Sequence, residues 1–220
     1  MPHPTTACTR SERRTRFTLV ELLVVISIIA VLASMLMPAL AKSKETSRRA
    51  VCKSNLRQYS VAFTLYCDEA DDYFPVPYWT AWYQVFPYLG ITKDAAGKWV
   101  DPQGLLLCPT DSTPAPVGSG HPGDRINISY GWNYALPGWP RRAGVPKDLI
   151  TQIPMLADSG NKVPSSYGLI SPWGSTNGYL CSARHAGGSE VLFCDQSVRW
   201  YRYEDLTYFQ NGIPRFWRGW

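Results

Sequence analysis

The chain has 220 residues, of which 45% are apolar and 13% aromatic, and a formal net charge of +5 at pH 7. This length fits one domain with an appendage or two small domains, and the apolar content excludes disorder as the main state. Residues 1–16 carry +3, residues 17–57 carry +4 and residues 58–220 carry −2. Because the basic residues flank an apolar segment, the charge favours a membrane surface over nucleic acid as the partner.

An uncharged segment of 20 residues extends from Leu22 to Ala41. A helix needs roughly 20 apolar residues to cross a bilayer core of about 30 Å. The apolar region of a cleaved secretory signal is usually only about 7–15 residues long. The sequence therefore predicts a membrane-spanning helix, with a buried helix of a soluble protein as the alternative, and the basic residues on both sides leave its orientation open.

Glu21 lies at the start of this apolar segment. A carboxylate there is costly in lipid and calls for a partner, which a single helix does not offer. The N-terminal amine of a neighbouring copy would serve if the chain were cut just before Phe17.

The segment RFTLVE, from Arg16 to Glu21, and the apolar residues after it resemble the processing signal of type IV pilins and type II secretion pseudopilins. The resemblance implies that prepilin peptidase removes residues 1–16 by cutting between Arg16 and Phe17. It also implies that Phe17 is methylated and that Glu21 pairs with the amine of another subunit. The family usually has Gly before the cut, where this chain has Arg16. Pro38 matches a proline that often kinks the family's helix.

The helical pattern continues beyond Pro38. Apolar residues recur at steps of four, three, four and three, which is typical of one face of an amphipathic helix: Cys52, Leu56, Tyr59, Phe63 and Tyr66. The acidic residues at 68–72 and Pro75 then predict the end of the helix. We therefore expect a membrane and filament-core helix over 17–41, its amphipathic continuation over 42–69 and a globular head over 70–220.

The head is rich in Gly, Pro and aromatic residues, a composition that favours short strands and ordered loops. Four strands are predicted: Ile126–Asn133, Ile153–Ala157, Glu190–Cys194 and Ser197–Tyr203. The last two form a tight hairpin around Asp195-Gln196. The predicted fold class is α+β, with a long N-terminal transmembrane helix packed against a small antiparallel sheet, as in pilins.

Segments of the amphipathic helix and of the head extend the resemblance to bacterial pilin-like proteins with a prepilin-type cleavage and methylation region. They include CKSNLRQ from Cys52, LCPTD at 107–111 and RHAGGSEVLFCD at 184–195. The last is similar to a His-x9-Asp-Gly signature, with Gln196 in place of its Gly. We interpret His185 and Asp195 as a hydrogen-bonded pair that joins the hairpin to its loop. A metal site and the base and orienter of an enzyme are the alternatives.

Loss of the leader removes Cys8 and leaves five cysteines: Cys52, Cys67, Cys108, Cys181 and Cys194. One or two disulfides are expected if the head lies outside the cytoplasm, although spacing does not show the pairing. No two cysteines are separated by two intervening residues (Cys-x2-Cys), so a structural zinc site is not expected. The acidic residues Asp68, Asp71 and Asp72 are candidate calcium ligands or a solvated helix end. No cofactor is expected.

The residues and the resemblance together predict a non-enzymatic subunit of a type IV pilus or a type II secretion system. It would cross the bacterial inner membrane once, with its head on the periplasmic or extracellular side. Its expected partners are lipid, prepilin peptidase and other pilin-like subunits, bound through the N-terminal helix. Two alternatives remain: an anchored protein that never polymerises and binds a polysaccharide through its tryptophans, and an anchored hydrolase that uses His185 and Asp195.

Overall fold

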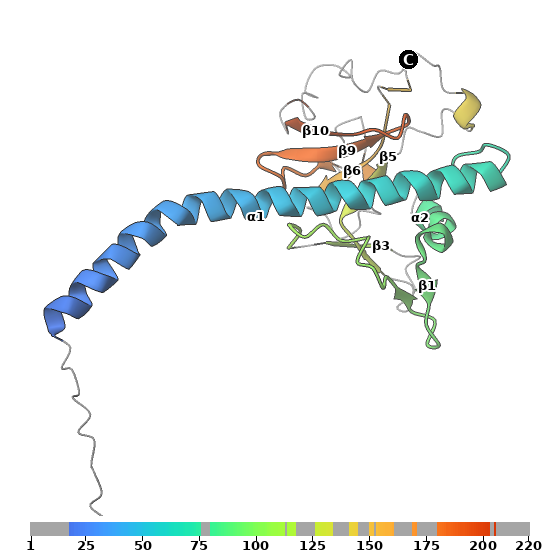
Figure 1. Ribbon diagram of the computed structural model, residues 1–220. Coiled ribbons are helices and arrows are strands. Elements are labelled where there is room, and N and C mark those ends of the chain that lie inside the picture. Colours follow the sequence, from blue (N-terminus) through green and yellow to red (C-terminus); the bar gives the residue numbers. More distant parts are fainter. Residues whose placement is uncertain are drawn as a thin grey trace, which may run out of the picture. The chain divides into compact units, whose positions relative to one another are not determined.

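A computed structural model describes residues 18–75, 80–112, 114–117, 126–133, 141–144, 150–151, 153–160, 169–170, 180–202 and 205. The predicted processing residues Arg16 and Phe17 lie outside this part of the chain. The molecule divides into two units, Met1–Ser43 and Lys44–Trp220, and each is described by itself. The helix α1, Leu19–Glu69, belongs to both units (Figure 1).

The N-terminal half of α1, defined here as residues 19–43, begins with a reciprocal cap. The Glu21 backbone N–H donates to the Thr18 hydroxyl at 3.2 Å, and Glu21 Oε2 accepts the Thr18 backbone N–H at 2.8 Å. This capping box satisfies two of the free donors at the helix start. Glu21 therefore has a partner within its own chain, contrary to the expectation that a single helix offers none.

The large apolar side chains from Leu19 to Leu40 are 45–86% exposed within the chain. The most apolar 18-residue window of α1 has a mean hydropathy of 2.8 and no buried residue. This segment is therefore long and apolar enough to cross a membrane. The α-helix continues through Pro38.

The head-side half of α1, residues 44–69, buries one face in the globular unit. The predicted apolar face is confirmed, because four of its five residues are buried and Tyr66 is half-buried: Cys52, Leu56, Tyr59 and Phe63. The helix ends at Glu69, as the acidic residues predicted. Asp71 and Asp72 then adopt left-handed backbone conformations, with φ of 49° and 66°, and the Asp72 N–H bonds back to the carbonyl of Cys67 at 2.8 Å.

A six-stranded sheet forms the centre of the head. Its order is β10-β9-β6-β5-β7, with β8 paired to β6, and every described pair is antiparallel except β5 with β7. Its strands are β5 Tyr130–Asn133, β6 Pro154–Gly160, β7 Leu169–Ile170, β8 Leu180–Cys181, β9 Gly188–Phe193 and β10 Val198–Arg202.

Two further strand pairs and three short helices complete the described part of the head. The pairs are β1 Thr92–Lys93 with β2 Trp99–Val100, and β3 Ala115–Val117 with β4 Ile126–Ile128. The helices are α2 Thr80–Val85, η1 Phe86–Leu89 and η3 Arg142–Gly144. The long apolar helix with small, mainly antiparallel sheets is an α+β arrangement, as predicted.

The predicted strands are present with altered bounds. The strand predicted over 126–133 is split into β4 and β5 at Ser129, whose N–H donates to the Leu106 carbonyl at 2.8 Å. The hairpin of β9 and β10 is confirmed, but its turn is longer than two residues. The Phe193 carbonyl accepts the Gln196 N–H at 2.9 Å, and Gln196 has φ 66°. In hairpins whose turn ends in a residue with a left-handed backbone, that residue is usually Gly, and here it is Gln196.

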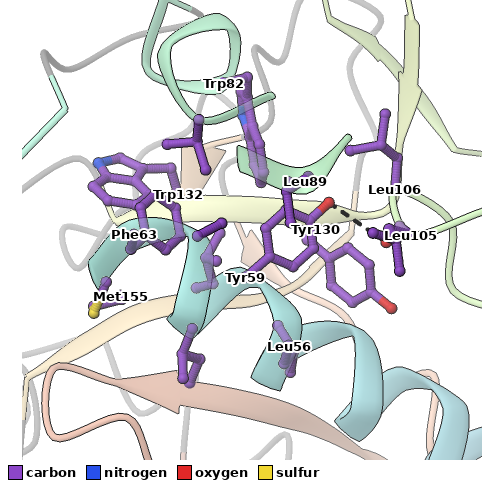
Figure 2. Packing of buried hydrophobic residues seen from close by; sticks show 14 of the residues in the cluster. Leu56, Tyr59, Phe63, Trp82, Leu89, Leu105, Leu106, Tyr130, Trp132 and Met155 are labelled. Atoms are coloured by element: carbon purple, nitrogen blue, oxygen red, sulfur yellow. Dashed lines mark hydrogen bonds between the residues drawn. The ribbon is translucent and has the colours of Figure 1, made fainter. Parts of the chain in front are cut away.

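Aromatic rings join the head-side half of α1 to the sheet (Figure 2). The Tyr59 ring makes edge contacts with Trp82 of α2 and Tyr130 of β5, at centroid distances of 5.5 and 5.6 Å. The ring centroids of Phe63 and Trp132 of β5 are 4.5 Å apart. Because these rings are all at most 2% exposed, this half of the helix is part of the core.

Candidate functional site

Four buried polar side chains from four segments meet beside the head-side half of α1. Cys52 comes from α1, Cys108 from the loop after β2, Asp158 from β6 and His185 from the turn before β9. Their residues are 0–2% exposed, and one sulfur, nitrogen or oxygen atom from each lies within 4.8 Å of all the others. We call these four residues the dithiol cluster.

The closest contact in the dithiol cluster joins the two sulfurs. Cys52 Sγ lies 2.7 Å from Cys108 Sγ, and both cysteines are free. Cys108 Sγ is also 3.3 Å from His185 Nε2, which in turn lies 3.7 Å from Asp158 Oδ2. Cys108 and His185 therefore stand at the middle of the cluster.

A tight turn holds His185 in place. The His185 and Gly188 backbones exchange two hydrogen bonds of 3.0 Å, and between them Ala186 and Gly187 have φ of 51° and 81°. A Cβ on Gly188 would collide with the Tyr201 carbonyl and the Trp200 ring. Trp200 Nε1 also donates to the His185 carbonyl at 2.9 Å. These contacts fix the backbone of His185.

A buried ion pair brings the Cys108 loop to this turn. The Cys108 carbonyl accepts the Asp111 N–H at 2.9 Å, and the Asp111 carboxylate lies 2.7 Å from the Arg184 guanidinium. Arg184 also donates to the Ser129 carbonyl at 2.7 Å. Two segments singled out in the sequence, 107–111 and 184–195, thus meet at one place.

Asp158 is the least satisfied member of the cluster. Its Oδ2 accepts the Glu190 N–H at 3.0 Å, whereas its Oδ1 has no hydrogen-bond partner among the described residues. Burial, together with the charge of Cys108, raises the pKa of Asp158 to about 7. A buried carboxylate oxygen without a partner is uncommon in proteins and is expected to bind another group.

The other three members influence one another's protonation. The hydrogen bond from Cys52 and contact with His185 lower the pKa of Cys108, while the same pairing and burial raise the pKa of Cys52. Burial lowers the pKa of His185, but its contacts with Cys108, Asp158 and Glu45 outweigh this and raise that pKa to about 9. The arrangement favours a thiolate on Cys108.

The predicted pair of His185 and Asp195 is not brought together. His185 Nδ1 instead lies 3.1 Å from Glu45 Oε1 of α1. Asp195 Oδ1 accepts the Ser197 N–H at 2.9 Å, and its Oδ2 accepts from Arg199 at 2.8 Å. Asp195 thus stabilises the turn between β9 and β10, while His185 belongs to a different site.

The candidate calcium ligands lie next to a cation of the chain itself. Arg142 of η3 forms ion pairs of 2.7 Å with both Asp68 and Asp72. Asp71 is exposed. The three carboxylates therefore do not converge on a shared cation position.

The remaining cysteines lie away from the dithiol cluster or outside the described side chains. Cys67 and Cys194 are buried, and both line a small cavity beside Phe63 and Met155. Cys181 is in β8, and its side chain lies outside the described set.

Two members of the site and its surroundings were missed by sequence reasoning. Asp158 is a single acidic residue in an otherwise apolar and small-residue strand, PMLADSG, and this could have marked it as a buried ligand. Glu45 resembles any surface charge on a helix, so its sequence context carries no such signal.

The chain matches no protein-family model, no curated protein and no solved structure.

Proposed function

We propose that the chain is a non-enzymatic, pilin-like structural subunit of a type IV pilus or a type II secretion system. The observation that carries the proposal is the contrast within α1. Its N-terminal half is apolar on all sides and exposed, while the same helix continues into the core of a folded head. A subunit stored in a membrane and assembled through its helix needs both properties.

The exposed half needs a non-aqueous environment. A helix that is apolar all round is stable in lipid or among other helices, but not in water. In a membrane this environment is lipid, and in a filament it is the same segment of neighbouring subunits. Helices exchange lipid for one another through close packing and interhelical polar contacts.

Glu21 provides the polar contact in this proposal. Both hydrogen bonds that the Glu21 carboxylate accepts from Thr18 end on Oε2. We place the amine of a neighbour's Phe17 at Oε1, after prepilin peptidase cuts between Arg16 and Phe17. The capping box then orients the carboxylate, and the amine neutralises its charge. An acid left unpaired among apolar helices costs several kcal/mol, so this pairing would set the register between subunits.

The test separates the charge of Glu21 from its role in the cap. Gln also serves as the last residue of a capping box, so Glu21→Gln keeps the cap and removes the charge. Thr18→Ala removes the cap and keeps the charge. We expect Glu21→Gln to insert into membranes and fold its head but to lose filament assembly, whereas Thr18→Ala still assembles, as measured by electron microscopy of sheared filaments.

Mass spectrometry of the mature N-terminus tests the processing step in the same samples. The expected mass begins at a methylated Phe17. Normal assembly of Glu21→Gln would exclude the charge pairing, and an intact leader in assembled material would exclude the processing step.

A further inference from the structure

We propose that the dithiol cluster binds one zinc ion, which joins α1 to the sheet of the head. The cluster offers two sulfurs, one imidazole nitrogen and one carboxylate oxygen, all buried and within 4.8 Å of one another. Four ligands of these kinds are typical of a structural, tetrahedral zinc site. The thiolates disfavour Mg²⁺ and Ca²⁺, which prefer oxygen ligands alone.

Two of the separations in the cluster match those of a tetrahedral site, and the sulfur–sulfur distance is shorter. Bonds of about 2.0–2.3 Å from zinc to nitrogen, oxygen and sulfur place tetrahedral ligands about 3.3–3.8 Å apart. Cys108 Sγ to His185 Nε2 is 3.3 Å, and His185 Nε2 to Asp158 Oδ2 is 3.7 Å. The two sulfurs, at 2.7 Å, have to move apart by about 1 Å. Cys108 lies in a loop, so its backbone can make this movement more easily than that of Cys52 in α1.

A disulfide between Cys52 and Cys108 is the rival state. The 2.7 Å separation is longer than a disulfide bond of about 2.05 Å, so that closure also needs a movement of the sulfurs. The other two residues of the cluster decide between the states. Among the described residues, the buried Asp158 carboxylate accepts one hydrogen bond, from the Glu190 N–H at Oδ2, and none at Oδ1. A disulfide would leave it so, whereas zinc would add a second bond to this carboxylate.

The surroundings of His185 also fit a metal ligand. Its Nδ1 lies 3.1 Å from the carboxylate of Glu45, so that Nε2 faces the cluster. Zinc-binding histidines commonly donate their second ring N–H to a carboxylate, which fixes the tautomer and the ring orientation. The Glu190 N–H donates to Asp158 Oδ2, and this hydrogen bond orients the Asp158 carboxylate.

Zinc bound here would connect segments that are far apart in the sequence. Cys52 and Cys108 are separated by 56 residues, and Cys108 and His185 by 77. Metal binding therefore fixes the helix, the loop and two parts of the sheet to one another. This is the role of structural zinc in domains with a small core.

The test uses the full-length chain in detergent, purified under reducing conditions and then treated with zinc or cobalt alone. We expect about one tightly bound zinc per chain, the visible absorption of tetrahedral thiolate-bound Co²⁺, and a higher melting temperature with zinc than after chelation. Cys194→Ser, which changes a buried cysteine outside the cluster, should retain the metal. Cys108→Ser should lose it.

A second variant keeps the test decisive if Cys108→Ser does not fold. Glu45→Gln leaves all four ligands in place and should lower the zinc affinity about 10–100-fold. Failure of the reduced wild-type chain to bind zinc or cobalt would overturn the proposal. So would a disulfide between the Cys52 and Cys108 peptides, with no zinc, in protein isolated from cells and alkylated before any reduction.

Discussion

The two halves of α1 are one helix in two different surroundings. Large apolar side chains of the N-terminal half are 45–86% exposed, while Cys52, Leu56 and Tyr59 of the head-side half are 0% exposed. Both halves have enough helix-forming residues to continue without a break through Pro38. What differs is the partner, because the head covers one half, whereas no described residue of its own unit covers the other. Apolar content alone therefore does not tell which role a helix has.

The polar groups of the two halves differ in the same way. Glu21 in the N-terminal half is satisfied by Thr18, three residues away. In the head-side half, Arg49 bonds to Glu190 and Glu45 bonds to His185. The partners in these two pairs are 141 and 140 residues apart in the sequence. Local capping suits a helix that must be stable before it meets a partner, whereas distant pairs hold a helix in one folded domain.

Matched truncations of leucine should break this comparison most strongly. Leu56→Ala removes a fully buried side chain and should destabilise the head by about 2–5 kcal/mol. Leu32→Ala, at a side chain that is 56% exposed in the chain, should leave the stability of the head unchanged. Urea unfolding in detergent, followed by tryptophan fluorescence, measures both, since every tryptophan lies in the head. Equal losses in the two variants would contradict the division of α1.

A substitution at Gly188 tests the part of the sheet that lies next to the cluster. A methyl group there meets the Tyr201 carbonyl and the Trp200 ring, and such overpacking typically costs about 1–3 kcal/mol. Gly144→Ala, where an added Cβ meets no described atom within 4 Å, is the control and should change stability by less than about 0.5 kcal/mol. Thermal melting of the two variants measures the difference. An unchanged melting temperature in Gly188→Ala would contradict this packing.

Removal of Arg49 sharpens the comparison within the head-side half. Glu190 is 3% exposed and Arg49 is 34% exposed, so loss of the 2.9 Å ion pair leaves a buried carboxylate with a partly solvated gap beside it. We expect Arg49→Met to cost about 1–2 kcal/mol, less than the loss of a fully buried pair. The exposed Arg57 on the same helix provides the control, and Arg57→Met should be close to neutral. A similar chemical denaturation midpoint for both variants would argue against a structural role for the pair.

The smallest effect is expected at the other end of the helix. Thr18→Ala should weaken the start of α1 by about 1 kcal/mol, because it removes the hydroxyl that accepts the Glu21 N–H. Hydrogen exchange should increase in the first turn, while the melting temperature of the head stays the same. A lower melting temperature would show that the two units are energetically coupled.

Periodicity was enough to predict much of the fold. The steps from Cys52 to Phe63 place side chains on one face of a helix, and that face is buried. The short strands predicted near 153–157, 190–194 and 197–203 are present as β6, β9 and β10. These patterns are local, so they can be read without knowledge of which segments meet.

The site could not be predicted in this way, because its four residues share no spacing. A search for the Cys-x2-Cys motif fails when each ligand comes from a different segment, as with Cys52, Cys108 and Asp158. The ten-residue spacing of His185 and Asp195 indicated a pair, but the turn after Phe193 directs Asp195 toward Arg199 instead. Only the pairing of strands places His185 beside α1.

The contacts of Glu45 and Arg49 determine how the head would respond to force. A pull along α1 toward its N-terminus would load the bonds from Glu45 to His185 and from Arg49 to Glu190, which join this helix to the head. The two contacts lie one helical turn apart on one element, so they would carry the load together instead of one after the other. Tension applied through the helix would thus reach β9 and the turn before it, at the centre of the head.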